Sequence, residues 1–328
     1  MKKLLSLEFL LLITIGILLS ACGSQNSNNS QGAGSNGDSV KINNLEKTIT
    51  FDKAPEHAVT LNQHATEIML ALGLEESMVG TAYLDDEILP KYKDAYKEIP
   101  VLSETSPSKE VFLASNPDFA YGGFSSAFSA KNIGTRDQLA ELGIKTYLHQ
   151  SSNTKGAEIE DVYEDIRNIG KIFRVEDRAD QLIKELKGKI QKITKQAGDK
   201  ATDFPVFVYD SGTDKAFTVG DSYLGHLIAT AGGKNIFDDI PKSWTEVSWE
   251  EVVYRKPEVI VIVDYGKISA EQKIESLLNN PKLKNVPAIK DKHFVVLPLS
   301  GSVPGIRAPL ALNTLIDGFN QEGKTTWE

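Results

Sequence analysis

A set of polar and aromatic side chains in this sequence follows short apolar runs or opens expected helices, and their types suit ligand binding. The set is His64, Tyr83, Tyr121, Phe124, Arg136, Tyr209, Trp244, Tyr265 and Arg307. An arginine fork pairs with two anionic oxygens and stays charged, and aromatic rings bury a large area against a flat ligand. Loops that follow parallel strands meet at one edge of a sheet. We therefore expect these residues to line a cleft for a bulky, anionic small molecule.

The two arginines have alternative explanations. Arg136 and Arg307 both stand at expected helix starts, where the helix dipole disfavours a cation. That position favours a task such as pairing with ligand oxygens. For Arg136, a local ion pair with Asp137 or Glu141 is the alternative.

The aromatic and histidine candidates also have structural alternatives. Phe124 lies in the loop 122–128, whose rings either face a ligand or fold back into the core. Trp244 and Tyr265 either close over a flat ligand or belong to the core. His64 is a candidate haem or metal ligand, or else a cap at the start of a helix. The histidines show no HxH, HxxH or HxxxH spacing, so we expect no directly bound metal ion.

Familiar catalytic motifs are absent from the sequence. It contains no Gly-x-Ser-x-Gly elbow, no P-loop and no HExxH. An exported α/β hydrolase using Ser125 or Ser211 is the enzyme alternative, but neither serine has the glycine-framed turn that exposes a nucleophile. An adhesin that holds a protein in the cleft is another alternative. We expect a binding protein without catalytic residues.

Short β-rich runs alternate with amphipathic helices from residue 46 onwards, which is typical of an α/β fold. Strands are predicted at 58–61, 78–82, 118–121 and 145–148, and then at 206–209, 216–219, 259–263 and 294–297. Between these groups the apolar spacing predicts one helix from residue 158, a break at 174–177, and a second helix of about 20 residues. The sequence therefore predicts two Rossmann-like lobes, 46–174 and 203–328. A single long backbone helix within 175–202 joins them, with the ligand cleft between the lobes.

The two halves also share a local pattern. Ser108–Phe119 and Ser248–Val259 each begin with a serine followed by acidic residues and reach a proline just before an expected strand. Because proline cannot continue a helix, each segment predicts a short helix that leads into a strand. The repeat supports two similar lobes.

The N-terminus has the layout of an export signal. Two lysines precede an apolar run over 9–19, which is too short for a permanent membrane helix, and small residues precede Cys22. This pattern looks like the lipobox of bacterial lipoproteins, and Cys22 is the sole cysteine. We expect a signal peptide over 1–21, a lipidated Cys22 and a flexible Ser/Asn/Gly-rich tether over 22–45. The alternative is an ordinary secretory peptide with an incidental cysteine. A net charge of −9 and a pI near 5.2 argue against a nucleic-acid partner.

Five segments in order between residues 49 and 319 resemble the helical-backbone, or class III, substrate-binding proteins of ABC transporters. The segments are 65–73 with Val79-Gly80, 108–119, 138–144, 232–237, and 248–259 with Trp244. Members of this family bind ferric siderophores, haem or cobalamin. The resemblance implies two lobes around a shallow cleft, little domain closure, and delivery of the ligand to an ABC permease with its ATPase subunits.

The resemblance also implies how the protein meets its partners. The positions that match the family's permease-docking acids are Glu110 and Glu250, with Glu251 as the alternative to the latter. Their other explanation is stabilisation of a helix N-terminus. The expected cargo is an iron(III)-siderophore chelate, followed by cobalamin and then haem, with no resident cofactor. We expect a monomer held by its lipid anchor alone on the extracytoplasmic face of the cell membrane of a Gram-positive bacterium.

Overall fold

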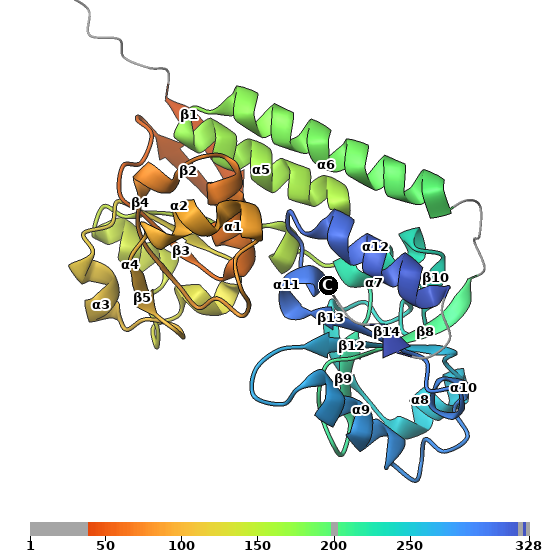
Figure 1. Ribbon diagram of the computed structural model, residues 1–328. Coiled ribbons are helices and arrows are strands. Elements are labelled where there is room, and N and C mark those ends of the chain that lie inside the picture. The colour runs from red at the N-terminus through yellow and green to blue at the C-terminus, as the bar shows by residue number, and fades with distance from the viewer. Residues whose placement is uncertain (1–38, 198–202, 321–323, 326–328) are drawn as a thin grey trace, which may run out of the picture. The chain divides into compact units, whose positions relative to one another are not determined.

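The computed structural model describes residues 39–197, 203–320 and 324–325 (Figure 1). The expected signal peptide, Cys22 and most of the expected tether lie outside the described residues. The C-terminal end of that tether is a correction. Strands β1 (Val40–Asn44) and β2 (Lys47–Phe51) form an antiparallel hairpin, so a tether reaching residue 45 is wrong. Ile42 and Phe51 of the hairpin are buried in the core, which holds it against the first lobe.

The first lobe is built on a parallel five-stranded sheet with the order β5-β4-β3-β6-β7. Its strands are β3 (Ala58–Leu61), β4 (Met78–Ala82), β5 (Val101–Ser103), β6 (Phe119–Gly122) and β7 (Lys145–Leu148). The central strands β3 and β6 are buried along their whole length, as expected where helices cover both faces of a sheet. The four predicted strands are present, and β5 was missed because it has only three residues.

Short helices connect these strands. They are α1 (Gln63–Ala71), α2 (Lys93–Lys97), α3 (Lys109–Ala114) and α4 (Arg136–Glu141), with 3₁₀ turns at Glu75–Ser77, Pro90–Tyr92, Ser125–Phe128 and Ser151–Asn153. Ser108 caps α3, because its hydroxyl accepts a hydrogen bond from the Val111 amide. Thr135 and Gln138 form a capping box at the start of α4.

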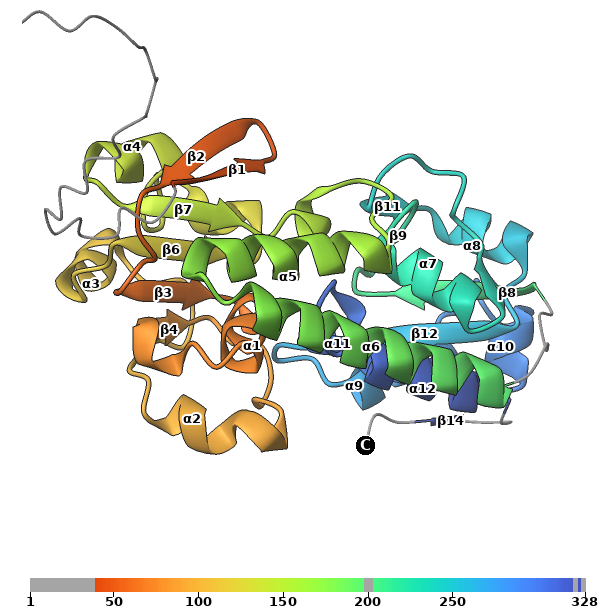
Figure 2. The same cartoon turned by 90° about the horizontal axis from the view of Figure 1, so that it is seen from above.

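Two antiparallel helices connect the lobes. They are α5 (Ile159–Phe173) and α6 (Glu176–Ala197), and Arg174 ends α5 in the left-handed conformation with φ 60°. The predicted break between two helices is therefore present. Figure 2 shows α5 lying beside α6, and Gly170 allows the close approach of Ala179. The long helix α6 brings the chain from the first lobe to the second, with α5 packed along it.

The second lobe repeats the architecture. Its parallel sheet has the order β10-β8-β12-β13-β14, formed by β8 (Phe204–Tyr209), β10 (Gly233–Asn235), β12 (Val259–Asp264), β13 (Phe294–Pro298) and β14 (Lys324–Thr325). Its helices are α7 (Tyr223–Thr230), α8 (Trp249–Arg255), α9 (Ala270–Leu278), α10 (Pro287–Lys290), α11 (Leu299–Ser302) and α12 (Ala308–Phe319). Strands β9 (Ala216–Val219) and β11 (Trp244–Val247) pair with each other as a separate antiparallel ribbon. The predicted strand at 216–219 is thus present, but outside the parallel sheet.

Candidate ligand cleft

The carboxyl ends of the two parallel sheets meet between the lobes. In the first sheet β3 has β4 on one side and β6 on the other, so the loops after β3 and β6 diverge at a topological switch point. His64 opens the helix after β3, and a Cβ added at Gly305 of the second lobe would lie 3.2 Å from the His64 Cβ. The loops that follow the strands of both lobes therefore touch each other.

A small pocket lies at this junction and is lined from both sides. The first lobe contributes Phe124, Ser151, Ser152 and Thr154, and the second contributes Val219, Ser222, Tyr223, Leu224, Ser243, Trp244, Ser302, Val303 and Pro304. Its volume is about 20 Å³, enough for little more than one water molecule. A bulky ligand therefore needs the facing side chains to move apart or binds at the outer rim of this junction.

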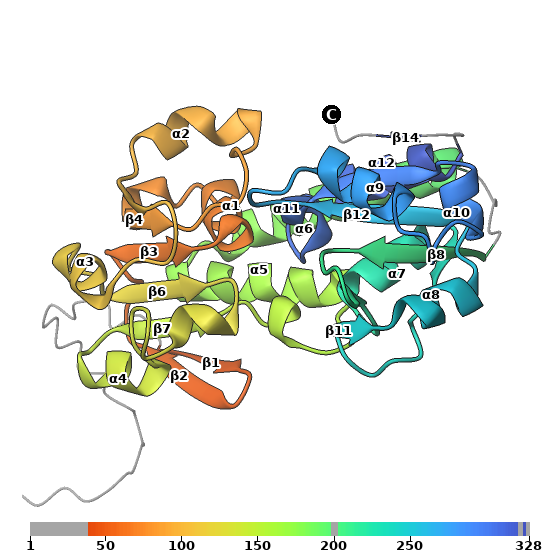
Figure 3. The ribbon, with the colours of Figure 1, turned by 90° about the horizontal axis from the view of Figure 1, so that it is seen from below.

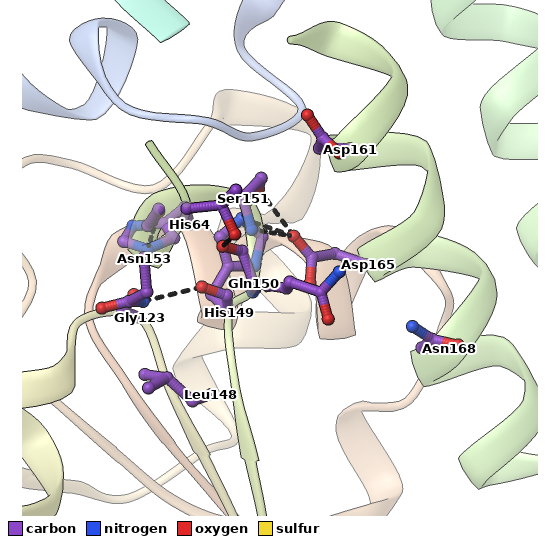
Figure 4. Close-up of polar contacts among 12 residues, drawn as sticks. His64, Gly123, Leu148, His149, Gln150, Ser151, Asn153, Asp161, Asp165 and Asn168 are labelled. Atoms are coloured by element: carbon purple, nitrogen blue, oxygen red, sulfur yellow. Dashed lines mark hydrogen bonds and ion pairs between the residues drawn. The ribbon is translucent and has the colours of Figure 1, made fainter. Parts of the chain in front are cut away.

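A buried polar network supports the first-lobe wall of the pocket (Figure 4). Asp165 of α5 accepts hydrogen bonds from the amides of Gln150 and Ser151, at 2.8 and 2.9 Å, and from the Ser151 hydroxyl at 2.6 Å. The Tyr147 hydroxyl donates to the same carboxylate at 2.7 Å. Through these bonds α5 fixes the loop that follows β7, and hence the serines that line the pocket.

Two neutral histidines pack face to edge behind that loop. The rings of His64 and His149 lie 4.7 Å apart, and burial lowers the pKa of each to about 3. The His64 pKa is lowered further by the neighbouring His149. Gly123 makes room for His64, because a Cβ there would lie 2.5 Å from the imidazole. Burial raises the pKa of Asp165, while its hydrogen bonds oppose that shift.

Ser151, His149 and Asp165 have the composition of a catalytic triad but not its geometry. The Ser151 Oγ contacts the His149 Nε2 at 2.9 Å and donates directly to Asp165, so the imidazole does not stand between the other two groups. The other imidazole nitrogen faces the Tyr121 hydroxyl at 2.6 Å. Ser151 is only 2 % exposed. The cluster is a positioning network and provides no accessible nucleophile.

Arg307 is engaged in a buried ion pair between the lobes. Its Nη2 and Nε donate to the two carboxylate oxygens of Glu67, at 2.6 and 2.9 Å, and the two side chains are 5 % and 1 % exposed. Asp86 lies 3.6 Å from the same guanidinium and accepts a hydrogen bond from Ser300 at 2.7 Å. The expectation that Arg307 lies between the lobes is correct, but its charge is already met by protein carboxylates.

Arg136 does not lie at the cleft. Its guanidinium is buried against the first-lobe hairpin, where it donates to Thr146 at 3.1 Å and to the Asn44 side chain at 2.8 Å. The expectation that it faces a ligand is wrong, because the β1–β2 hairpin covers it. The carboxylate nearest its guanidinium is that of Glu46, at 4.0 Å, and the alternative partner Asp137 pairs with Lys47 instead.

Tyr121 and Tyr209 were also expected at the cleft and lie in the core. Tyr121 is fully buried and contacts His149 through its hydroxyl. Tyr209 is buried beside Trp249, and its hydroxyl donates to the Gly212 carbonyl. Each stands near the end of its strand, but with the ring turned into the core of its own lobe.

The four other aromatic candidates are partly or fully accessible, whereas His64 is buried behind the loop after β7. Trp244 lines the pocket and stacks on Phe217, with ring centroids 5.7 Å apart and an angle of 17° between the planes. Phe124 lines it from the other lobe and packs against His64. Tyr83 is exposed, and the hydroxyl of the partly buried Tyr265 donates to Asp210 at 2.7 Å. The stacked Trp244 and Phe217 rings form a flat apolar surface on the β9–β11 ribbon.

The hydroxyl-bearing residues of the pocket leave little signal in the sequence. Ser151, Ser222, Tyr223 and Ser302 come from loops or helix starts of unremarkable composition. Ser222 caps α7, which brings Tyr223 to the pocket. The buried Tyr223 hydroxyl makes no hydrogen bond of ordinary geometry within the described residues. A buried hydroxyl without a partner is costly, so this group is suited to donate to a ligand atom or a water.

The expected docking acids occupy equivalent places in the two lobes. Glu110 is the second residue of α3 and Glu250 the second residue of α8, and each helix is capped by a serine. Figures 1 and 3 show α3 and α8 on the side of the protein away from α6. Glu250 pairs with Lys282 at 2.9 Å, which lowers the Glu250 pKa, whereas Glu251 accepts a hydrogen bond from Arg255 within its own helix.

Neither a metal cluster nor a membrane helix is found in the part of the chain that the structure describes. In that part no group of three or more His, Cys, Asp or Glu side chains is placed to hold a metal ion. None of its helices combines the length and the apolar character needed to cross a membrane.

Comparison with known proteins agrees with this architecture. Residues 59–300 match the family model described as periplasmic binding protein. The petrobactin-binding protein YclQ of Bacillus subtilis is 27% identical over 308 residues, covering 90% of this chain and 91% of the relative. The uncharacterized ABC transporter substrate-binding lipoprotein YvrC of the same organism is 27% identical over 228 residues, 69% of each chain.

A solved structure supports the same assignment. A periplasmic binding protein from Veillonella parvula superposes with a TM-score of 0.79 at 32% identity, covering 86% of this chain and 98% of that one. The two parallel sheets, the connecting helix and the junction between their carboxyl ends are thus features of a non-enzymatic binding protein. The chain belongs to the periplasmic binding protein family and is a substrate-binding protein of the ABC-importer type.

Proposed function

We propose that this protein captures an iron(III)-siderophore complex and delivers it to an ABC permease. The observation that supports this most directly is the junction between the lobes, where hydroxyl-bearing residues of both lobes line a pocket together with Trp244, whose ring stacks on Phe217. Hydroxyls bind the oxygen atoms at the periphery of a chelate, and a flat aromatic surface contacts its apolar parts. The relative named as petrobactin-binding lends the proposal further support.

The charges at the junction indicate which net charge of iron(III) chelate suits this site. Arg307 is neutralised by Glu67, and Arg136 lies elsewhere in the first lobe. Among the described residues, no lysine or arginine lines the pocket, so an anionic chelate there would lack a cationic partner, and burying an unpaired charge is costly. An iron(III) complex of three hydroxamates is uncharged, whereas one of three catecholates carries three negative charges. We therefore favour a hydroxamate-type chelate.

The location follows from the N-terminus. We propose that Cys22 is lipidated and holds the mature protein, as a monomer, on the outer face of the cell membrane of a Gram-positive bacterium. The small residues ahead of the sole cysteine support this, as does the relative named as a lipoprotein. Radiolabelled palmitate should be incorporated into the native protein and not into a Cys22→Ala variant. Equal labelling of both would contradict it.

Fluorescence quenching tests the cargo, because Trp244 lies at the junction. We expect sub-micromolar binding of a ferric tris-hydroxamate and weaker binding of a ferric tris-catecholate. Trp244→Ala should weaken hydroxamate binding by about tenfold, the loss of roughly 1.4 kcal/mol of aromatic contact. Because Trp244→Ala lacks the tryptophan at the junction, its cargo affinity is measured by calorimetry. Trp249→Phe, which changes a buried tryptophan outside the pocket, is the control and should keep the native affinity. Tight binding of cobalamin or haem with none of any siderophore complex would replace this cargo with one of the other two.

A further inference from the structure

A second, larger hollow lies outside the junction between the lobes. Its volume is about 610 Å³, which is in the range of small-molecule sites. One wall is helix α6, the opposite wall is α12, and the segment 89–91 of the first lobe closes one end. Figure 2 shows α6 and α12 lying side by side. None of the residues assigned to the cargo pocket lines this groove.

The floor of the groove is apolar. Ile306 and Pro309 are buried at its base, the partly buried Ile193 projects from α6, and Leu310 is 43 % exposed beside them. Leu89 contributes a further apolar side chain from the first lobe. These side chains come from three parts of the chain and form one recessed apolar surface.

The rim of the groove is cationic. Lys91, Lys189 and Lys192 line it, and no carboxylate does. Within the described residues no ion pair joins any of these ammonium groups to an acid, although Lys91 also lies over the Tyr92 ring. A carboxylate one turn away on α6, Glu185, accepts a hydrogen bond from Gln181, and Asp317 of α12 accepts one from Asn313. In a chain with a net charge of −9, this local excess of positive charge is distinctive.

We propose that the groove binds a single amphipathic anion, with an aliphatic chain on the apolar floor and an acidic head group between the lysines. Charge complementarity selects the head group, and the apolar floor selects the chain. The floor residues Ile306 and Pro309 are recessed. A flat bilayer surface cannot reach them, so the occupant is a separate molecule such as a fatty acid.

The position of the groove links its occupant to the contact between the lobes. Leu89 lines the groove, and its amide donates to Glu67 at 3.1 Å. Ile306 lies at the base of the groove and is adjacent to Arg307, the partner of Glu67. The ion pair thus joins the end of the groove to its base. A molecule that contacts both parts stabilises the arrangement in which Arg307 and Glu67 meet.

Binding can be measured on the full chain with 11-(dansylamino)undecanoate, whose fluorescence rises in apolar surroundings. We expect saturable binding, displacement by dodecanoate, and no displacement by the cationic dodecyltrimethylammonium. Lys189→Glu combined with Lys192→Glu should weaken binding by about tenfold or more through loss of the charge contacts. Leu310→Asp should weaken it without unfolding the protein, because Leu310 is partly exposed.

The matched control is Lys184→Glu combined with Lys187→Glu. Both lysines lie on α6 outside the groove, and the change in net charge is the same. This variant should retain the affinity of the native protein. Absence of saturable binding, or equal weakening in both double variants, would overturn the proposal. Binding to anionic phosphatidylglycerol vesicles but not to free dodecanoate would also overturn it, in favour of a membrane surface. Because the readout needs no siderophore, it is independent of the proposed cargo.

Discussion

Arg307 of the second lobe and Glu67 of the first are 240 positions apart and form a two-pronged ion pair that is almost fully buried. Glu67 also accepts hydrogen bonds from Gln63 and from the Leu89 amide, so its carboxylate has several partners on its own lobe. The pair therefore joins the middle of α1 to the start of α12. Together with the Ser300–Asp86 hydrogen bond, it helps to set the relative placement of the lobes.

Removing the guanidinium should be costly. We expect Arg307→Ala to lower the free energy of unfolding by about 3 to 5 kcal/mol, because Glu67 is left as a buried charge. Adding Glu67→Gln should recover part of that loss. Urea denaturation of both single variants and the double variant measures the coupling. The exposed Lys93–Glu87 pair is the control, where Lys93→Ala should cost less than about 1 kcal/mol. Additive effects of the two substitutions at 67 and 307 would contradict the coupling.

Arg136 should matter for stability and not for cargo. Its bonds to Asn44 and Thr146 attach α4 to the hairpin and to β7, so Arg136→Ala should destabilise the protein by about 2 kcal/mol. Cargo affinity should be unchanged at a temperature where the variant is folded. Thermal unfolding and titration calorimetry measure the two effects. Arg167→Ala, at a partly exposed i,i+3 pair with Glu164, is the control. A selective loss of affinity with native stability would restore Arg136 to the ligand site.

The buried histidines should make stability depend on pH. Their folded-state pKa of about 3 lies below the ordinary histidine pKa of about 6.5, so between these values the unfolded chain binds more protons and stability falls as the pH falls. Each histidine can contribute a slope of up to about 1.4 kcal/mol per pH unit. The raised pKa of Asp165 acts in the opposite sense, because the stability that protonated Asp165 contributes at low pH is lost as the pH rises.

Unfolding free energies at several pH values between 4 and 7 test this slope. His64→Gln should flatten the dependence, because it removes one of the two buried imidazoles. An equal slope in the native protein and in His64→Gln would show that His64 is protonated in the folded state.

Reversing the charges of the expected docking acids should impair delivery of the cargo to the permease and leave cargo binding intact. Glu110→Lys combined with Glu250→Lys should reduce uptake by about tenfold or more while the cargo affinity stays constant, because both carboxylates are exposed and outside the cleft. Transport in vesicles containing the permease measures uptake. Glu141→Lys with Glu258→Lys, one exposed acid per lobe, is the control. Normal uptake by the variant with both docking acids reversed would exclude this role.

How far the sequence specifies the ligand site is illustrated by Arg136 and Trp244. Both stood at plausible positions along the chain, but Arg136 is covered by the β1–β2 hairpin and Trp244 lies on a ribbon that reaches the junction. Tyr121 was placed correctly at the end of its strand, and its ring turns into the core because alternate side chains of a strand face opposite sides.

The sequence by itself determined the class of fold and the family, because periodicity, proline breaks and helix caps are local, and the five family segments are contiguous stretches. It also specified the two connecting helices and the equivalent positions of Glu110 and Glu250. The tertiary structure alone decided that Arg307 meets Glu67, that Asp165 supports the pocket wall, and that three lysines surround an apolar groove. These contacts join residues far apart in sequence, and which groups become buried together depends on how the lobes and helices pack.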